Sequence, residues 1–334
     1  MSVLVVDGAA FFANITNHEP PTFPLIGYQV QKLIEYVNAL GLVTLTALFG
    51  VFTNIANISV YLKMGLRETT NINFFALSVF DLLVCMVSVV AQITNNGPVS
   101  QMTMPSGARF TEVAIAAIYI TYPCLGCSAW VTAILSVERY LCIATPLKVK
   151  DIITPQRTRA LILTMVAYQS VFLILFFTNP GPPYDAVDPK RALYFNCSFS
   201  APTFICFFIV VVSTILLVVK LRQNLEWRNE STNQSSKNLG SSKEQKATRS
   251  VLAICTIFIA CFALNLALFF ASLVYPRFTH MDPYLGSLFR VLYSFSTLLQ
   301  LLSATVNIFV YYKMSTKYRE IFTALFCRHR ETTG

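Results

Sequence analysis

Long apolar runs, separated by short polar segments, dominate the pattern of the chain. Seven runs are long enough to cross a bilayer as helices of ~20 residues, and Asp81 is the only Asp, Glu, Lys or Arg within them. Their polar positions recur at helix-length spacing, which predicts seven spanning α-helices in one bundle and therefore an all-α membrane protein. The predicted spans are Tyr36–Leu62, Ile72–Ile93, Val113–Val137, Ala160–Asn179, Cys197–Val219, Ser250–Pro276 and Val291–Tyr312.

Composition and charge give this bundle an orientation. Of the 334 residues, 55% are hydrophobic and only 12% are charged, about half the ~25% charged share of a soluble domain. Basic residues accumulate in cytoplasmic loops, and 18 of the 25 Lys and Arg residues lie in the loops after spans one, three and five or in the C-terminal tail, with Arg139 counted as part of a helix end. We therefore predict a multi-pass plasma-membrane protein with its N-terminus outside. Its net charge of +9 then faces anionic membrane lipids, so no nucleic-acid partner is expected.

The chain divides into the bundle and three flanking segments. We expect an outer tail at 1–32, the bundle at 33–315, a short surface helix at 316–327 and a cytoplasmic tail at 328–334. The Ser- and Asn-rich stretch near 222–246 has no periodicity, which predicts a flexible inner loop within the bundle. After span seven, apolar side chains lie on one helical face and basic ones on the other, as is typical of an amphipathic helix on a membrane surface.

Polar residues inside the spans are the first candidates for function, because each costs free energy in hydrocarbon unless it has a partner. Asp81 is a lone carboxylate that is expected to face the bundle interior and hold a cation or a proton. In span seven, polar residues recur at four-residue steps along one face. The expected cluster comprises Asn54, Asp81, Ser128, Ser303, Asn307 and Tyr311. The alternative is that these residues form ordinary interhelical hydrogen bonds.

Several motifs occur together along the chain. They are Glu138-Arg139-Tyr140 with Pro146 seven residues after the Arg, Asp81 in span two, Asn307 and Tyr311 in span seven, and the amphipathic stretch that follows. In this combination the chain resembles the rhodopsin-like G-protein-coupled receptors, over essentially its whole length from Tyr36 to Cys327. The resemblance implies a receptor that binds an extracellular ligand and activates a heterotrimeric G protein. It also implies a sodium ion at Asp81, and no other cofactor is expected.

The resemblance further implies a switch at the cytoplasmic ends of the helices. Arg139, between Glu138 and Tyr140, would contact the G protein, and Leu147 would offer an apolar contact from the second inner loop. Glu244 lies at a similar depth to Arg139, and such a pair closes spans three and six in the resting state of the family. Two unrelated surface charges are the alternative reading of Glu244.

The chain departs from the family pattern at several positions. Thr53 replaces a Gly in the motif around Asn54, Phe262 replaces a Trp, and Leu264 and Ile308 replace the prolines of spans six and seven. Because proline bends a helix, we expect the activation hinges to be softened or relocated. The family disulfide is also in question, since Cys197 would need a partner where the chain has Ala114, so Cys197 is either free or paired between chains.

The ligand is constrained mainly by exclusion. Leu301 stands where opsins carry the retinal-binding Lys, and Thr121 stands where amine receptors keep an Asp, so neither retinal nor a biogenic amine is expected. Height along the helices predicts a pocket of Thr121, Tyr122, Phe262, Asn265, Phe269, Tyr293 and Thr297. Charged residues around its mouth favour a peptide. The segments 145–155 and 307–319 look like invertebrate orphan receptors near the neuropeptide and chemosensory branches, so a small chemosensory molecule is the alternative.

Modification sites and other functional classes complete the predictions. Sequons at Asn14 and Asn196 lie on the outer side and are expected to be glycosylated, whereas the sequon at Asn57 falls within a span and is expected to stay bare. Cys327 is a candidate for palmitoylation, or else an unmodified buried cysteine. The sequence contains neither a zinc-binding motif nor a phosphate-binding loop, so an enzyme is not expected. A non-coupling decoy receptor stays open because of the missing prolines, and a seven-helix transporter is disfavoured because Asp81 is the only charge in the spans.

Overall fold

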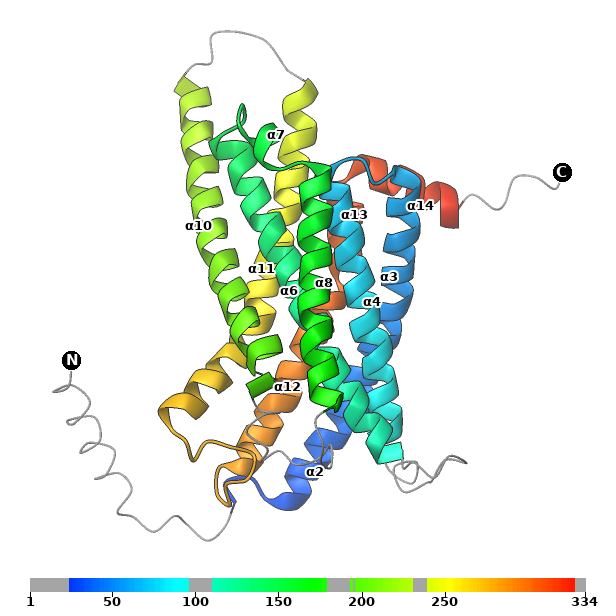
Figure 1. The fold of residues 1–334 in the computed structure, drawn as a ribbon, viewed down its shortest axis with the longest axis vertical. Helices are drawn as coiled ribbons and strands as arrows, with labels where there is room; N and C mark the ends of the chain where they lie inside the picture. The colour runs from blue at the N-terminus through cyan, green and yellow to red at the C-terminus, as the bar shows by residue number, and fades with distance from the viewer. Residues whose placement is uncertain (1–23, 96–109, 179–192, 195, 231–238, 328–334) are drawn as a thin grey trace, which may run out of the picture.

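The computed structural model describes residues 24–95, 110–178, 193–194, 196–230 and 239–327, and it is a bundle of long helices (Figure 1). Within these ranges, seven helices are long and apolar enough to cross a membrane. They are Tyr28–Met64, Thr69–Thr94, Glu112–Ala144, Pro155–Thr178, Ala201–Gln223, Lys246–Val274 and Gly286–Met314. Each predicted span falls on one of them, so the predicted seven-helix, all-α membrane fold is confirmed.

Span one is a composite of three helical segments. It consists of α2 (Tyr28–Tyr36), the π-helix η1 (Val37–Val43) and α3 (Thr44–Met64). Helix therefore begins at Tyr28, earlier than the predicted apolar run and inside the segment predicted as tail. The early start has a tertiary cause, since Gln31 of α2 accepts a hydrogen bond at 3.2 Å from Arg290 of span seven. Hydropathy along the sequence does not report such a contact.

Span three lies in the middle of the bundle. The helices of this part are α4 (Thr69–Asn95), α6 (Phe110–Ala144), the short α7 (Val149–Ile152) and α8 (Pro155–Thr178). Span three is α6, and it packs against α4, α8, α10 and α11. Pro123 lies inside α6, one residue after Tyr122. Proline has no N–H to donate to the preceding turn and therefore bends a helix. Span three thus contains a proline that can bend it, whereas the helices of spans six and seven contain no proline.

Spans five and six reach beyond the apolar runs. The π-helix η2 (Asn196–Ser200) leads into α10 (Ala201–Glu230), and α11 (Leu239–Val274) forms span six. Most of the predicted flexible loop at 222–246 is therefore helical, which corrects that prediction. The polar ends of these helices form intrahelical hydrogen bonds whether or not they lie in hydrocarbon, so apolar runs understate helix length. Helix α11 is continuous through Leu264, the position of the missing proline.

Span seven is interrupted without a proline. It consists of α12 (Gly286–Thr305) and α13 (Asn307–Met314), and Val306 between them has φ −81° and ψ −6°. Helix α14 (Thr316–Phe326) follows at the position predicted for the surface helix, with Ser315 as its N-cap. Figure 1 shows α14 at the end of the bundle that also carries α7, opposite α2. These two ends are called the α14 end and the α2 end below.

Close helix contacts at the bundle centre depend on small residues. Gly50 of α3 lies where an added Cβ would come within 2.4 Å of the Cys85 Sγ atom and 2.7 Å of the Thr305 Oγ1 atom. Spans one, two and seven therefore meet at Gly50, as small residues permit in membrane bundles. Large apolar side chains such as Phe52 (71% exposed) and Leu163 (68%) cover the outer surface. In a membrane, the hydrocarbon of the bilayer would cover these exposed apolar side chains.

Candidate functional site

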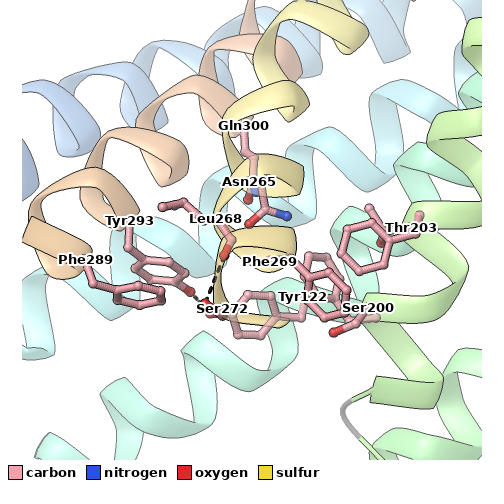
Figure 2. Close-up of a pocket in the computed structure, with 12 residues that line it drawn as sticks. Tyr122, Ser200, Thr203, Asn265, Leu268, Phe269, Ser272, Phe289, Tyr293 and Gln300 are labelled. Atoms are coloured by element: carbon pink, nitrogen blue, oxygen red, sulfur yellow. Dashed lines mark hydrogen bonds between the residues drawn. The ribbon is translucent and has the colours of Figure 1, made fainter. Parts of the chain in front are cut away.

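A cavity of about 200 Å³ lies toward the α2 end, among spans three, five, six and seven (Figure 2). Its lining consists of aromatic, aliphatic, hydroxyl and amide side chains. These are Tyr122, Phe199, Ser200, Thr203, Phe204, Asn265, Leu268, Phe269, Ser272, Phe289, Tyr293 and Gln300. None of these twelve lining residues carries a charge at neutral pH. The cavity therefore suits an uncharged group that offers apolar surface and a few hydrogen bonds.

Four of the seven predicted pocket residues line this cavity, namely Tyr122, Asn265, Phe269 and Tyr293. The other three are absent from its lining. Thr121 donates its hydroxyl to the Ala117 carbonyl at 3.0 Å, and Thr297 donates to the Tyr293 carbonyl at 3.1 Å, so both hydroxyls bond to their own helices. Phe262 is buried at 4% exposure and stacks on Phe258 with ring centroids 4.3 Å apart. Placing residues by height alone ignores which way each side chain points.

Eight lining residues were not predicted. Phe199, Ser200, Thr203 and Phe204 come from η2 and the start of α10, and the others are Leu268, Ser272, Phe289 and Gln300. Gln300 carried a signal in the sequence, because an amide inside a spanning helix needs a partner or a cavity. The residues at the η2–α10 junction carried none, since a segment entering the bundle from a loop can be placed only by tertiary structure.

Two tyrosines from different spans meet at this cavity. The hydroxyls of Tyr122 in α6 and Tyr293 in α12 contact each other in a hydrogen bond, drawn dashed in Figure 2. The ring of Tyr122 also packs against Phe199 with centroids 4.7 Å apart. Spans three and seven are thus joined at the cavity by side chains that a ligand there would touch.

Asp81 lies at the centre of the bundle, buried at 1% exposure. Its Oδ1 atom accepts a hydrogen bond from the Ser128 hydroxyl at 2.7 Å, and its Oδ2 atom accepts one from the Asn307 amide at 2.9 Å. These bonds join span two to spans three and seven. The structure therefore brings together three of the six residues predicted for the polar cluster. Within the described ranges, no Lys or Arg forms an ion pair with Asp81.

The other three predicted members have different surroundings. Asn54 donates its amide to the Ala304 carbonyl and to the Gly50 carbonyl, both at 2.9 Å, so it joins span one to span seven. Tyr311 is buried in an aromatic group, with its ring 4.8 Å from that of Phe74. For Ser303, the described part of the chain shows no side-chain hydrogen bond to Asp81. The predicted single cluster is thus a central triad with separate flanking contacts.

At the α14 end, Glu138 and Arg139 form a buried network with span two. Arg139 is 6% exposed and its Nη2 atom lies 2.5 Å from Glu138 Oε1 and 2.6 Å from Thr70 Oγ1. Glu138 is 1% exposed and also accepts from Thr69 at 2.6 Å and from Asn73 at 2.7 Å. A solvated helix end is therefore excluded for this pair. Because buried charges persist only when paired, these contacts hold the inner ends of spans two and three together.

A larger cavity of about 1030 Å³ opens beside this network. Its lining includes Arg139, Ser250 of α11, Tyr311 of α13 and Lys317 of α14, and residues of α3, α4 and α8 complete it. Leu147, between α6 and α7, is 92% exposed, and Tyr140 is partly buried. Glu244 belongs to α11, but its side chain lies outside the described part of the structure, and its predicted pairing with Arg139 stays a prediction.

The predicted modification sites are only partly visible. Asn14 and the side chain of Asn196 lie outside the described residues, and Cys327 is exposed directly after α14. All nine cysteines are free thiols in the structure, Cys197 among them, so the family disulfide is absent here. A hydrogen bond at 2.8 Å from the Tyr168 hydroxyl to the Cys197 carbonyl connects span four to this segment.

Seven spanning helices, a central carboxylate bonded to spans three and seven, and a buried Glu138–Arg139 network at one end define a class of membrane receptor. The family described as 7 transmembrane receptor (rhodopsin family) matches residues 54–311, and the chain belongs to this family. The resemblance read from the motifs is thereby confirmed.

Several known receptors are similar to the chain over most of its length. The thyrotropin-releasing hormone receptor of Bos taurus is 24% identical over 93% of this chain and 82% of that receptor. Its Homo sapiens counterpart is 22% identical over 96% of this chain and 84% of the receptor. Neuromedin-U receptor 1 of Rattus norvegicus is 23% identical over 81% of this chain and 67% of that receptor.

Proposed function

We propose that the chain is a plasma-membrane receptor that binds an extracellular peptide at the α2 end and activates a heterotrimeric G protein at the α14 end. The orientation is supported by the loops of the α14 end, which contain most of the basic residues and would face the cytoplasm. A peptide is supported by the similarity to receptors for thyrotropin-releasing hormone and neuromedin U.

The uncharged cavity is the single observation that carries the ligand proposal. At about 200 Å³ it is smaller than the roughly 300–1,000 Å³ of pockets that enclose a whole small ligand, so it would take only one end of a peptide. A charged terminus buried there would have no counterion, and burying an unpaired charge is costly. The inserted end is therefore neutral. Asn265, Gln300 and the buried Thr203 hydroxyl, which has no partner among the described residues, would hydrogen-bond to it.

The opposite cavity supports the G-protein proposal. Arg139 lies on its wall, held toward span two by Thr70 and Glu138. If a ligand stabilised an arrangement with span six swung outward, the cavity would widen and Arg139 would become available to a G-protein segment. A ligand acts in this way only if it binds the open arrangement better than the closed one. The tyrosine pair at the first cavity supplies such a difference, because a ligand that separates Tyr122 from Tyr293 alters the contact of spans three and seven.

A sodium ion at Asp81 fits the residues found there. The carboxylate has no basic partner among the described residues, and the Ser128 hydroxyl oxygen lies next to it. Carboxylate and hydroxyl oxygens are ligands that hard cations prefer. Asp81 and Ser128 would hold the ion, and its charge would offset that of the buried carboxylate. This would stabilise the arrangement in which spans two, three and seven stay close together.

The proposal is tested with purified receptor and peptides supplied in two forms, with a neutral C-terminal amide or a free carboxylate. Activation is read as nucleotide exchange on a panel of purified G proteins. We expect agonism from neutral forms only, and a loss of roughly tenfold or more in potency for Asn265→Leu, because one buried hydrogen bond is removed. Thr297→Val is the matched control, since its hydroxyl bonds to its own helix outside the cavity lining.

Two outcomes would contradict the proposal. Equal potency of amide and carboxylate forms would refute the neutral-end argument. Saturable peptide binding without nucleotide exchange on any G protein would instead favour a non-coupling decoy receptor.

A further inference from the structure

Helix α14 is attached to the bundle through a buried hydroxyl. Tyr318 is 0% exposed although it belongs to a short helix outside the spans, and it donates its hydroxyl to the Asn57 Oδ1 atom of span one at 2.6 Å. Burial raises the pKa of the Tyr318 hydroxyl above its usual value, so the hydroxyl keeps its proton and remains a donor. Asn57 is itself 0% exposed, and this contact accounts for an amide within a membrane span.

The contact with Asn57 continues inward to span seven. The Asn57 Nδ2 atom donates to Asn54 Oδ1 at 3.4 Å, and Asn54 Nδ2 in turn donates to the Ala304 carbonyl at 2.9 Å. Ala304 lies two residues before Val306, where span seven is interrupted. Four consecutive groups therefore connect α14 with the interruption in span seven through side chains of span one.

We propose that the Tyr318–Asn57–Asn54 hydrogen-bond chain couples the docking of α14 to the conformation of span seven at its interruption. Asn57 and Tyr318 act as positioning residues that touch neither the ligand cavity nor Asp81. When α14 is docked, Asn57 is satisfied on both sides and presents its amide to Asn54. When α14 leaves, the Asn57 oxygen loses its donor, and Asn54 can turn from the Ala304 carbonyl to compensate.

Because the Tyr318–Asn57 hydrogen bond is buried, removing only one of its two partners is costly. An amide left without a partner in a buried site loses the full benefit of solvation, whereas replacing both partners with apolar groups of similar shape is nearly neutral. The surrounding rings would tolerate such a replacement, since Tyr318 packs against Tyr61 and Tyr311, each with ring centroids 5.6 Å away. The hydrogen bond can therefore be removed without removing the aromatic contact.

Hydrogen–deuterium exchange of the full chain in detergent tests the coupling. The measurement needs no agonist and no G protein, so its result is independent of the proposed function. Tyr318→Phe keeps the ring and removes the donor, and we expect amide exchange to rise by about tenfold both in α14 and in span seven near Val306–Phe309. We expect the same two increases in exchange for the single variant Asn57→Val. In the double variant Asn57→Val/Tyr318→Phe, α14 should return to within about twofold of its original rate, because neither side of the Tyr318–Asn57 contact is left unsatisfied. Span seven should exchange no faster than in Asn57→Val alone, because Asn54 lacks the Asn57 donor in both variants.

The matched control is Ile321→Ala, which removes an apolar contact of α14 with the core and leaves the hydrogen bond in place. Because the Tyr318 hydrogen bond still holds the start of α14 on the bundle, this variant should raise exchange only in the part of α14 that follows Ile321. The proposal is overturned if Tyr318→Phe and Asn57→Val behave like this control, with span seven unchanged. It is equally overturned if the double variant exchanges as fast as the sum of the single variants, because the two residues would then act independently.

Discussion

Glu138→Gln is the most direct test of the buried network at the α14 end. The carboxylate accepts hydrogen bonds from Thr69 at 2.6 Å, Thr70 at 3.1 Å and Asn73 at 2.7 Å, all from span two, and it pairs with Arg139 at 2.5 Å. Glutamine preserves the size of the side chain but removes its charge. The NH2 group of glutamine cannot accept hydrogen bonds, so it cannot replace the carboxylate oxygen that accepted from span two.

The magnitude follows from these contacts. A hydrogen bond to a charged group contributes about 1.5–3 kcal/mol and a neutral one about 1 kcal/mol. Arg139 is on the same helix as Glu138, so that pair can persist in any arrangement, and only the bonds to span two favour the closed one. Weakening those bonds by about 2 kcal/mol in total shifts the closed–open equilibrium by roughly 30-fold toward the open arrangement.

Ligand-free nucleotide exchange by reconstituted receptor and G protein measures this shift. We expect the basal rate to rise by about tenfold or more for Glu138→Gln, at equal amounts of folded receptor. Glu112→Gln makes the same substitution at the other end of α6 and should leave the rate unchanged. An unchanged basal rate in Glu138→Gln would refute the argument that the bonds to span two restrain Arg139.

Two further predictions concern the bundle centre. Gly50→Ala should lower the melting temperature of the receptor, at a cost of about 1–3 kcal/mol, because its Cβ would lie 2.4 Å from the Cys85 Sγ atom. Gly41→Ala, with no atom within 4 Å of its added Cβ, is the matched control, and equal melting of the two variants would contradict the packing argument. Asp81→Asn should keep the fold, because an amide can still accept from Asn307 and donate to Ser128, yet abolish stabilisation by sodium. Melting curves in sodium chloride and in choline chloride at equal ionic strength measure this, and retained sodium dependence would exclude Asp81 as the ligand.

The fold and the central triad were predictable because the membrane imposes them locally. Each span must satisfy its own backbone and present apolar side chains, so hydropathy alone locates it. A lone carboxylate in hydrocarbon must find polar partners, which reduces the choices for Asp81 to a few residues. Ser128 and Asn307 were among the expected partners, and the structure places both within hydrogen-bond distance.

The cavity lining was less predictable because it depends on helix rotation and on chain segments outside the spans. Thr121 and Tyr122 are adjacent in sequence, yet only Tyr122 lines the cavity. Hydroxyl side chains within helices often bond to the preceding turn, as Thr121 does, and such a bond turns the side chain away from a cavity. Phe199 and Ser200 enter the site from η2, whose position relative to the bundle no periodicity reports.

The interruption of span seven without a proline has an explanation in another departure from the family pattern. The Phe309 N–H bonds to the Val306 carbonyl at 3.1 Å instead of continuing the ladder to the Thr305 carbonyl. Thr53 of span one, which stands where the family has Gly, shares its single hydroxyl proton between the Gly50 carbonyl of its own helix at 3.1 Å and that Thr305 carbonyl at 3.3 Å. A side chain thus offers a shared donor in place of the N–H that the break withdraws, as Ser and Thr do elsewhere in membrane helices. Ile308 stands where the family has the proline that forms this hinge. Here the Thr53 hydroxyl of span one stabilises the interruption instead, so the interruption depends on the contact between spans one and seven.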